Sequence, residues 1–358
     1  MRRGSLRPHS RSAHRRGRIG FDYLREVVFI SAIIAAVLVV QQSLRSNAAT
    51  TSDHPHSDHP VYSMTLSHNG QRLWVSREAY GLSEIDLNDG TECEHSRLFD
   101  AEASYTSHGG MDRPLTLRFS FDRSLELLQG NTPVHGERLS EGFENISDSD
   151  VSSDGRTAVL VTSRGWIKIW NEQADSTFTS RELRVASTID SVTLTRNGHR
   201  AVLLGDEMIV WLDLQTGAEL ARWRTSDGGA TKKVLSGRPE AVALSPDEAH
   251  LALGFSNGLV RVWDCATKQI VWERFADQYK TSALAFSPSG LLASGGFDKG
   301  VRVWDWRTDT LRWERTYHTR ASHDLAFAAD ESRLYSGGLD GKVIELDSIT
   351  GELVRTLP

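Results

Sequence analysis

The stretch SALAFSPSGLLASGGFDKGVRVWDWRTDTLRWER, residues 282–315, decides the fold. It reads as a short apolar strand, a Ser-Pro turn, a second strand, a tight turn with glycine, the segment V-R-V-W-D and a fourth apolar segment that ends in W-E-R. Four short strands with turn residues between them predict one antiparallel sheet. Residues 240–274 and 324–357 repeat the same order, so the sheet is one unit of a repeat.

The first turn of each unit measures the period of this repeat, which is about 42 residues. Candidate first turns begin at Ser67, Ser120, Ser152, Thr195, Ser245, Ser287 and Ala328. Units of this kind predict an all-β fold, a seven-bladed β-propeller of four-stranded antiparallel blades, preceded by one N-terminal hydrophobic helix. The propeller is expected over residues 61–358. Its predicted repeats are 61–100, 101–145, 146–186, 187–236, 237–280, 281–320 and 321–358.

The turns and the V-R-V-W-D segments at 260–264 and 301–305 resemble those of WD-repeat (Trp-Asp repeat) proteins. The resemblance is strong over residues 239–358, partial in the third and fourth units, and weak in the first two, which hold no Trp-Asp pair. It implies a hydrogen-bonded set in each blade: a His before the first strand, a Ser in the second, an Asp in the tight turn and a Trp in the third.

Carried over residue by residue, this resemblance gives a set of structural residues in the blades. They are Ser294, Asp298 and Trp304 in the sixth unit, His318, Ser336 and Asp340 in the seventh, Asn257 and Trp263 in the fifth, Trp211 in the fourth and Trp170 in the third. No unit holds the full set, because Asp277 stands at the His position of the sixth unit and Leu346 at the Trp position of the seventh.

Two further expectations concern the edges of the blades. Trp272 and Trp313 recur in the fourth strand, so we expect both to be half exposed. Residues 351–357 read as the fourth strand of their own unit, which argues against closure of the ring by a strand shared between the two ends of the chain.

An apolar residue directly precedes the turn Asp in the last two units. These residues are Phe297 and Leu339, and a tight turn buries such a side chain poorly. The resemblance places this position near the partner-binding surface, so we expect a protein partner there, held by rigid display of apolar anchors within a polar rim. Local packing between neighbouring turns is the alternative interpretation.

Catalytic patterns are missing from the sequence. It has no phosphate-binding G-x-x-x-x-G-K and no zinc-binding H-E-x-x-H. Residues 254–258 match G-x-S-x-G, but a strand follows them where a nucleophile elbow needs a helix. We therefore predict a non-catalytic protein without a cofactor. The alternative is an extracytoplasmic propeller enzyme or small-ligand sensor that uses acidic or His side chains at the central channel.

Charge is unevenly distributed along the 358 residues. Residues 1–45 hold nine Arg against two acids, a net charge of +7, whereas the remaining residues have a net charge of −13. The acidic body would repel phosphates, so no nucleic-acid partner is expected.

Residues 1–26 are expected to form a basic cytoplasmic tail, and residues 27–44 a transmembrane or signal-anchor helix. Eighteen residues span roughly 27 Å as a helix, which just crosses a thin membrane core of about 30 Å. The predicted anchor residues are Val27, Val28, Phe29, Ile30, Ile33, Ile34, Val37, Leu38, Val39 and Val40. The propeller would then lie outside the cytoplasm. Two alternatives are a cleaved signal peptide, which gives a secreted or periplasmic protein, and a cytosolic scaffold that buries the apolar stretch.

Residues 45–60 form a linker with a repeated Asp-His-Pro unit. His54, His56 and His59 are a weak candidate for a divalent metal site. A stiff, extended spacer is the favoured interpretation, because the two prolines keep these side chains from sharing a helix face.

Overall fold

The computed structural model describes residues 59–67, 70–77, 81–96, 101–106, 115–120, 124–129, 132–141, 143, 146–152, 154–205, 207–225 and 237–358. Their regular secondary structure consists of strands β1 to β28. The strands form seven four-stranded antiparallel sheets, each made from four consecutive strands. We call these sheets blades and number them in chain order.

The strand bounds follow the repeat. Blade one contains β1 (Val61–Leu66), β2 (Arg72–Arg77), β3 (Gly81–Asp86) and β4 (Glu92–Ser96). Blade two contains β5 (Ala101–Thr106), β6 (Leu115–Ser120), β7 (Ser124–Gln129) and β8 (Thr132–Arg138). Blade three contains β9 (Ile146–Val151), β10 (Thr157–Thr162), β11 (Trp166–Glu172) and β12 (Phe178–Arg184). Blade four contains β13 (Ser191–Leu194), β14 (Arg200–Gly205), β15 (Met208–Asp213) and β16 (Glu219–Arg224).

The last three blades have the most regular sequence. Blade five contains β17 (Pro239–Leu244), β18 (His250–Phe255), β19 (Leu259–Asp264) and β20 (Gln269–Phe275). Blade six contains β21 (Thr281–Phe286), β22 (Leu292–Gly296), β23 (Val301–Asp305) and β24 (Thr310–Arg315). Blade seven contains β25 (Ser322–Phe327), β26 (Arg333–Gly338), β27 (Val343–Asp347) and β28 (Leu353–Leu357).

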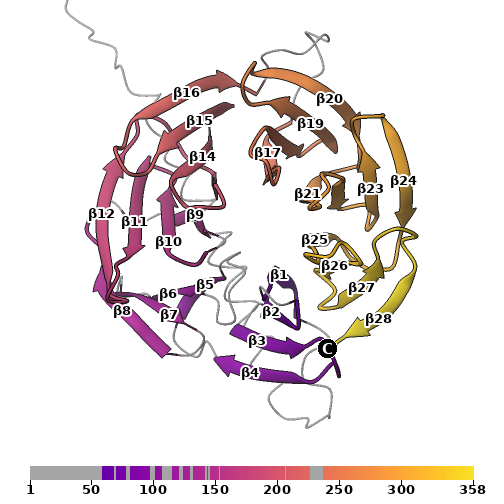
Figure 1. Ribbon diagram of the computed structural model, residues 1–358, viewed down its shortest axis with the longest axis horizontal. Helices are drawn as coiled ribbons and strands as arrows, with labels where there is room; N and C mark the ends of the chain where they lie inside the picture. The colour runs from indigo at the N-terminus through magenta and orange to yellow at the C-terminus, as the bar shows by residue number, and fades with distance from the viewer. Residues whose placement is uncertain are drawn as a thin grey trace, which may run out of the picture. The chain divides into compact units, whose positions relative to one another are not determined.

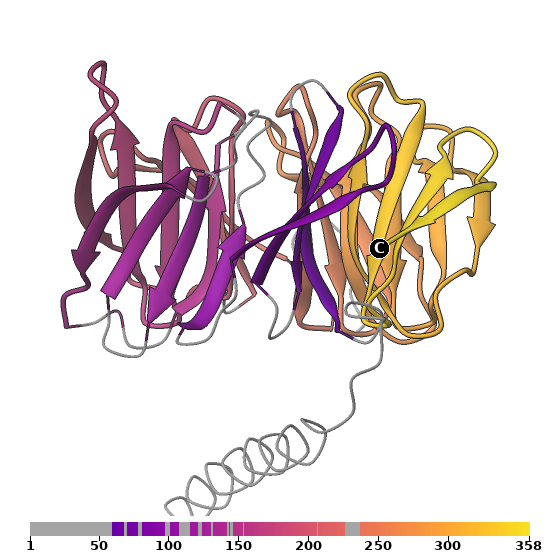
Figure 2. The same cartoon turned by 90° about the horizontal axis from the view of Figure 1, so that it is seen from below.

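The blades stand around a central axis, with the first strand of each innermost and the fourth outermost (Figure 1). Because consecutive strands are antiparallel, the turns after the first and third strands lie at one end of the ring. The turn after the second strand and the link to the next blade lie at the other end, and both ends are visible in the side view (Figure 2). We call the second of these the linker face.

Apolar side chains between neighbouring blades hold the ring together. All six residues of β10 (TAVLVT), a second strand, are buried, as expected for a strand covered by a blade on each face. Trp74, Trp170 and Trp263 are the largest fully buried side chains. Burial of such residues supplies the main stabilisation of the ring.

The predicted fold class needs correction in its N-terminal helix, which is not supported. The described residues contain no helix, and the predicted helix at 27–44 lies outside them. The seven four-stranded sheets pack unevenly against one another among the described residues. Buried apolar residues of the described part form six clusters, and none of these six joins β1–β4 to β5–β8.

Blade two shows why one candidate turn was misplaced. Ser120 is the last residue of the second strand, β6, and does not begin the first turn of the unit. The fourth strand of this blade, which the sequence did not reveal, is β8 (TPVHGER). Only one of its residues, Val134, is a large aliphatic one and none is fully buried, so hydropathy does not mark it as a strand.

The ring closes without a shared strand. β28 pairs with β27 inside its own blade, which confirms the expectation for residues 351–357. Polar contacts join blade seven to blade one: the Met64 amide donates to Asp324 Oδ2 at 2.6 Å, and the buried Arg77 guanidinium donates to the Pro358 carbonyl. Arg355 donates in the same way to the Leu87 carbonyl.

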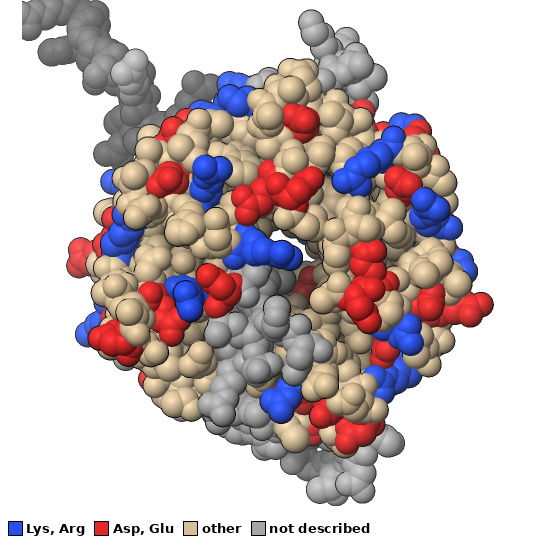
Figure 3. Space-filling model, viewed as in Figure 1, with Lys and Arg blue, Asp and Glu red and all other residues tan. Residues whose placement is uncertain are grey.

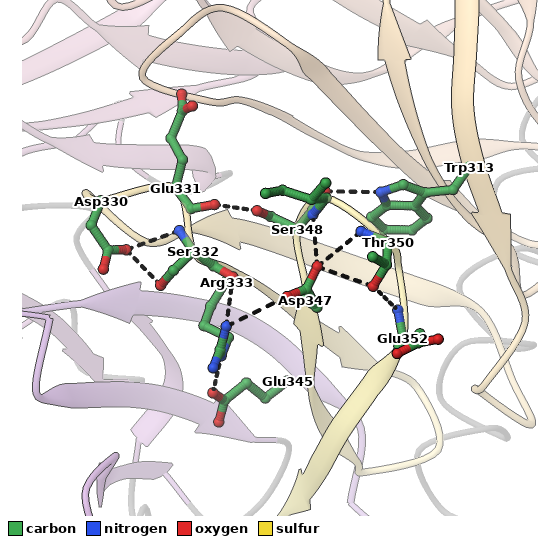
Figure 4. A network of polar contacts seen from close by, with 11 residues as sticks. Trp313, Asp330, Glu331, Ser332, Arg333, Glu345, Asp347, Ser348, Thr350 and Glu352 are labelled. Atoms are coloured by element: carbon green, nitrogen blue, oxygen red, sulfur yellow. Dashed lines mark hydrogen bonds and ion pairs between the residues drawn. The ribbon is translucent and has the colours of Figure 1, made fainter.

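Trp272 and Trp313 are buried, contrary to the expectation that they are half exposed. A turn of the following blade covers each indole and accepts its N–H: Trp272 Nε1 donates to Asp309 Oδ1 and Trp313 Nε1 to the Ser348 carbonyl, both at 2.9 Å. Figure 4 shows Trp313 against this turn, where the Asp347 carboxylate accepts the Thr350 amide. These fourth-strand tryptophans therefore join adjacent blades.

Several expectations fall on residues outside the described part. They are the basic tail, all the predicted anchor residues, His54 and His56. Within the described ranges, no helix has the length and apolar character needed to span a membrane.

Candidate protein-interaction face

Three large, exposed aromatic residues, which we call the aromatic cluster, lie on the linker face in segments that meet at the junction of blades five and six. Phe275 ends β20, Tyr279 lies in the link to β21, and Phe297 begins the turn between β22 and β23. Their exposed fractions are 60%, 63% and 42%. The Lys280 ammonium lies 5.4 Å from the centre of the Phe297 ring, so the cluster is apolar with a cation beside it.

Backbone hydrogen bonds hold the two segments of this cluster together. The Phe297 amide donates to the Lys280 carbonyl at 2.9 Å. Asp277 Oδ1 accepts the amides of Tyr279 and Lys280 at 2.6 and 3.0 Å, and its Oδ2 accepts the Asp298 amide at 3.1 Å. The residue that replaces the expected His thus fixes the link and the turn that carry the aromatic rings.

An acidic pair and one arginine lie beneath the cluster. Arg302 donates to Asp298 Oδ2 at 2.7 Å and to Glu314 at 2.5 Å. Burial and the neighbouring Asp298 raise the pKa of the Asp277 carboxyl. Burial alone would also raise the pKa of Asp298, but hydrogen bonds from Arg302 and from the Gly300 amide lower it. The arginine therefore keeps Asp298 ionised while Asp277 takes a proton more readily.

A cavity of about 430 Å³ opens beside this pair. It is lined by Asn257, Phe275, Ala276, Asp277, Gln278 and Arg302. The cavity thus combines an aromatic wall with polar groups, which is the composition of a surface that anchors a partner side chain.

Leu339 occupies the same turn position in blade seven. Its amide donates to the Ala321 carbonyl at 2.9 Å, and Arg320 donates to the Leu339 carbonyl at 2.9 Å. The residue is half-buried. Of the two predicted partner-binding residues, Phe297 therefore offers more accessible apolar surface than Leu339.

The structural residues of blades six and seven make two different networks. In blade six, Trp304 Nε1 donates to Ser294 Oγ at 2.9 Å. In blade seven, the His318 ring contacts Asp340 Oδ1 at 3.0 Å through Nδ1 and Ser336 Oγ at 2.9 Å through Nε2.

Leu346 is fully buried at the tryptophan position of blade seven and contributes only packing. The Asp340 carboxyl stays ionised: burial would raise its pKa, but hydrogen bonds from His318 and the Thr319 amide lower it.

The tryptophans of blades three to five are buried, as the third strand requires. Trp170 Nε1 donates to Glu137 Oε1 of the preceding blade at 2.5 Å. Trp211 and Trp263 have indole nitrogens without a hydrogen-bond partner among the described residues. Asn257 Oδ1 accepts the Leu259 amide at 3.3 Å and shapes the tight turn of blade five.

Carboxylates from the inner strands face neighbouring blades and are engaged there. Asp148 Oδ2 accepts the Ser191 hydroxyl at 2.6 Å and the Val192 amide at 2.9 Å, and Asp150 Oδ2 accepts the Leu194 amide at 2.7 Å. Burial raises the pKa of Asp148 to about 6 despite these donors. These acids join β9 to β13, which is a structural role.

The serine of the G-x-S-x-G match also has a structural role. Residues 254–258 form the hairpin between β18 and β19, where Ser256 Oγ accepts the Arg238 amide at 2.9 Å. The described residues contain no group of three His, Cys, Asp or Glu side chains arranged for a metal ion. Acidic and basic side chains are interspersed around the central opening, as Figure 3 shows for one face.

Phe275 and Tyr279 were not predicted from the sequence. A usable signal exists, since the repeat after W-E-R continues with Phe275 in one unit and with Thr316 in the next. An aromatic residue that departs from the repeat in a link is not needed for the blade and indicates a surface role.

Comparison with known proteins supports the repeat. The family model for the WD domain, G-beta repeat, matches residues 277–305, from Asp277 through the third strand of blade six. No curated protein matches the chain significantly.

Proposed function

Because this chain is a WD-repeat β-propeller, we propose that it is a non-catalytic scaffold that binds other proteins through its linker face. The observation that carries the proposal is the cluster of Phe275, Tyr279 and Phe297, which a folded ring leaves largely exposed. Aromatic anchors surrounded by polar groups are the residues that dominate protein interfaces.

Rigid display is the mechanism of this binding. Asp277 ties the aromatic link to the turn that carries Phe297 through three backbone amides. Little conformational entropy is then lost when a partner covers the rings, so more of the apolar burial appears as affinity.

Affinity capture with the full chain tests the proposal. Phe297→Asp should reduce the amount of captured partner at least about ten-fold, because a charge replaces an anchor at the centre of the contact. The matched control is Leu311→Asp. Leu311 has nearly the same exposed fraction, 40%, but lies on the outermost strand β24.

Both variants should keep the circular dichroism spectrum and melting temperature of the wild type. Equal capture by wild type and Phe297→Asp would contradict the proposed face. Equal loss in both variants would show that charge alone, and no particular surface, controls capture.

The location of the scaffold is a further part of the proposal. The +7 charge of residues 1–45 favours a cytoplasmic position for this segment and an extracytoplasmic position for the propeller, with attachment to the membrane. Fractionation of cells that express the full chain tests this. Release by an alkaline wash would contradict attachment, and an intact mass that lacks the first residues would indicate the secreted or periplasmic alternative.

A further inference from the structure

A second cavity opens on the linker face, at the junction of blades three and four. Its volume is about 390 Å³, and it is lined by Arg164, Arg184, Val185, Ala186, Ser187 and Thr188. Arg164 lies in the turn between β10 and β11, and Arg184 ends β12. The other four residues begin the link to β13. The turn after the second strand and the link after the fourth strand of one blade also line the cavity beside Asp277 at blades five and six.

The two segments of this cavity are locked together. Gly165 has a φ of +83°, and a side chain there would collide with the carbonyls of Val185 and Ser187. The Val185 amide donates to the Gly165 carbonyl at 2.9 Å. The Arg184 guanidinium lies 5.2 Å from the centre of the Trp166 ring, which orients it by a cation–π contact.

The chemistry of the lining selects an anion. The polar side chains that line it are two guanidiniums and two hydroxyls, all of which can donate hydrogen bonds, and none is an acid. Arg184 makes no ion pair with another described residue. Asp190 lies at the end of the same link but pairs with Arg238 at 3.3 Å. Planar guanidinium groups match the oxygens of a carboxylate or a phosphoryl group.

We propose that this cavity binds an anionic side chain, a carboxylate or a phosphoryl group, of the protein partner. The inference rests on the proposed function, because it adds a second contact on the same face. An aromatic anchor at blades five and six and a charged anchor at blades three and four would fix the orientation of the partner. A partner that carries only apolar anchors would lack this second contact.

Three short peptides test the cavity without any knowledge of the partner. They are N-acetyl-Gly-X-Gly-amides in which X is phosphoserine, glutamate or serine, titrated into the full chain at low salt and followed by ligand-observed NMR. We expect binding of the phosphoserine peptide, the glutamate peptide or both, and none of the serine peptide. Preference for phosphoserine identifies the phosphoryl group as the ligand, and equal or better binding of glutamate identifies the carboxylate.

Arg184→Gln should weaken the binding of the anionic peptide at least about ten-fold, since one charge-assisted contact is lost, and Arg164→Gln should act in the same direction. The control is Arg196→Gln. Arg196 is an exposed arginine of blade four in the turn between β13 and β14, at the other end of the ring. Failure of both anionic peptides to bind, or equal binding by Arg184→Gln and wild type, would overturn the inference.

Capture of the partner separates this inference from the proposed function. Phe297→Asp should lose the partner and keep the anionic peptide. If the full chain captures a partner and Arg184→Gln captures it equally well, the cavity plays no part in binding and only the proposed function stands. If the peptides bind but no partner is captured, the proposed scaffold role fails and the anion site remains.

Discussion

Blades six and seven solve the same structural problem with different side chains. Each must tie the link before its first strand to the turn between its second and third strands. Blade seven does so with His318, whose ring reaches both Asp340 and the buried Ser336. Blade six uses Asp277, which bonds to the backbone of the link and turn, while Ser294 accepts the Trp304 indole N–H.

The network of blade seven stabilises the fold, whereas the network of blade six supports an exposed surface. The His318 network is sealed, since the His side chain is fully buried and the Asp340 side chain is only 4% exposed. The Asp277 network borders a cavity and supports exposed aromatic rings. It also places two carboxyl groups side by side, which requires Arg302 as a counter-charge. Substitutions can therefore break the two networks with different consequences.

The largest effect is expected from His318→Ala in blade seven. The change removes two hydrogen bonds and leaves the buried Ser336 and Asp340 without this partner, so the free energy of unfolding should fall by about 3 kcal/mol. Urea denaturation of the full chain measures it. His199→Ala, at an exposed histidine, should change little. A loss for His318→Ala as small as that for the control would show that the network does not stabilise the blade.

A smaller and pH-dependent effect is expected from Arg302→Gln in blade six. Removal of the guanidinium leaves Asp277 and Asp298 as an uncompensated pair, which should cost about 2 kcal/mol at pH 7. Both carboxyls would then have pKa values in the folded state above those in the unfolded state. The free energy of unfolding is lost as pH rises through such values, so the deficit should shrink as pH falls from 7 toward 4.

Denaturation of Arg302→Gln and wild type across this pH range measures the deficit. In the wild type the pKa of Asp277 is already raised and that of Asp298 is lowered, so part of the pair is protonated at low pH in both proteins. A deficit that stays constant or grows on acidification would contradict the counter-charge role of Arg302.

The smallest effect is expected from Trp304→Phe, also in blade six. The indole N–H that bonds to Ser294 Oγ is lost, and the free energy of unfolding should fall by about 1 kcal/mol. Trp263→Phe is the matched change in blade five, where the indole nitrogen has no hydrogen-bond partner among the described residues, and it should act only through packing. Identical losses in the two blades would mean that the Trp–Ser bond adds nothing.

Sequence reasoning reaches furthest where the residues act within one blade. Turn chemistry and strand alternation are local properties of the sequence. They place the tight turns at Asp298 and Asp340 and the serines that recur in the second strands. Contacts between blades could not be predicted. Trp170 bonds to Glu137 of the preceding blade, and Trp272 is covered by a turn of the next one. The sequence does not determine such contacts until the blades are stacked. The aromatic cluster was half predicted, because Phe297 lies in a repeated turn and Phe275 departs from the repeat.

Closure of the ring by side chains has a consequence for how the chain folds. Every blade takes its four strands from one continuous stretch, so no sheet has to wait for a strand from the far end of the chain. Each blade can form as soon as its own residues leave the ribosome. Arg77, Arg355 and the Met64 amide then only dock finished surfaces. The slow search for distant strand partners, which limits the folding rate of many β proteins, is thereby avoided.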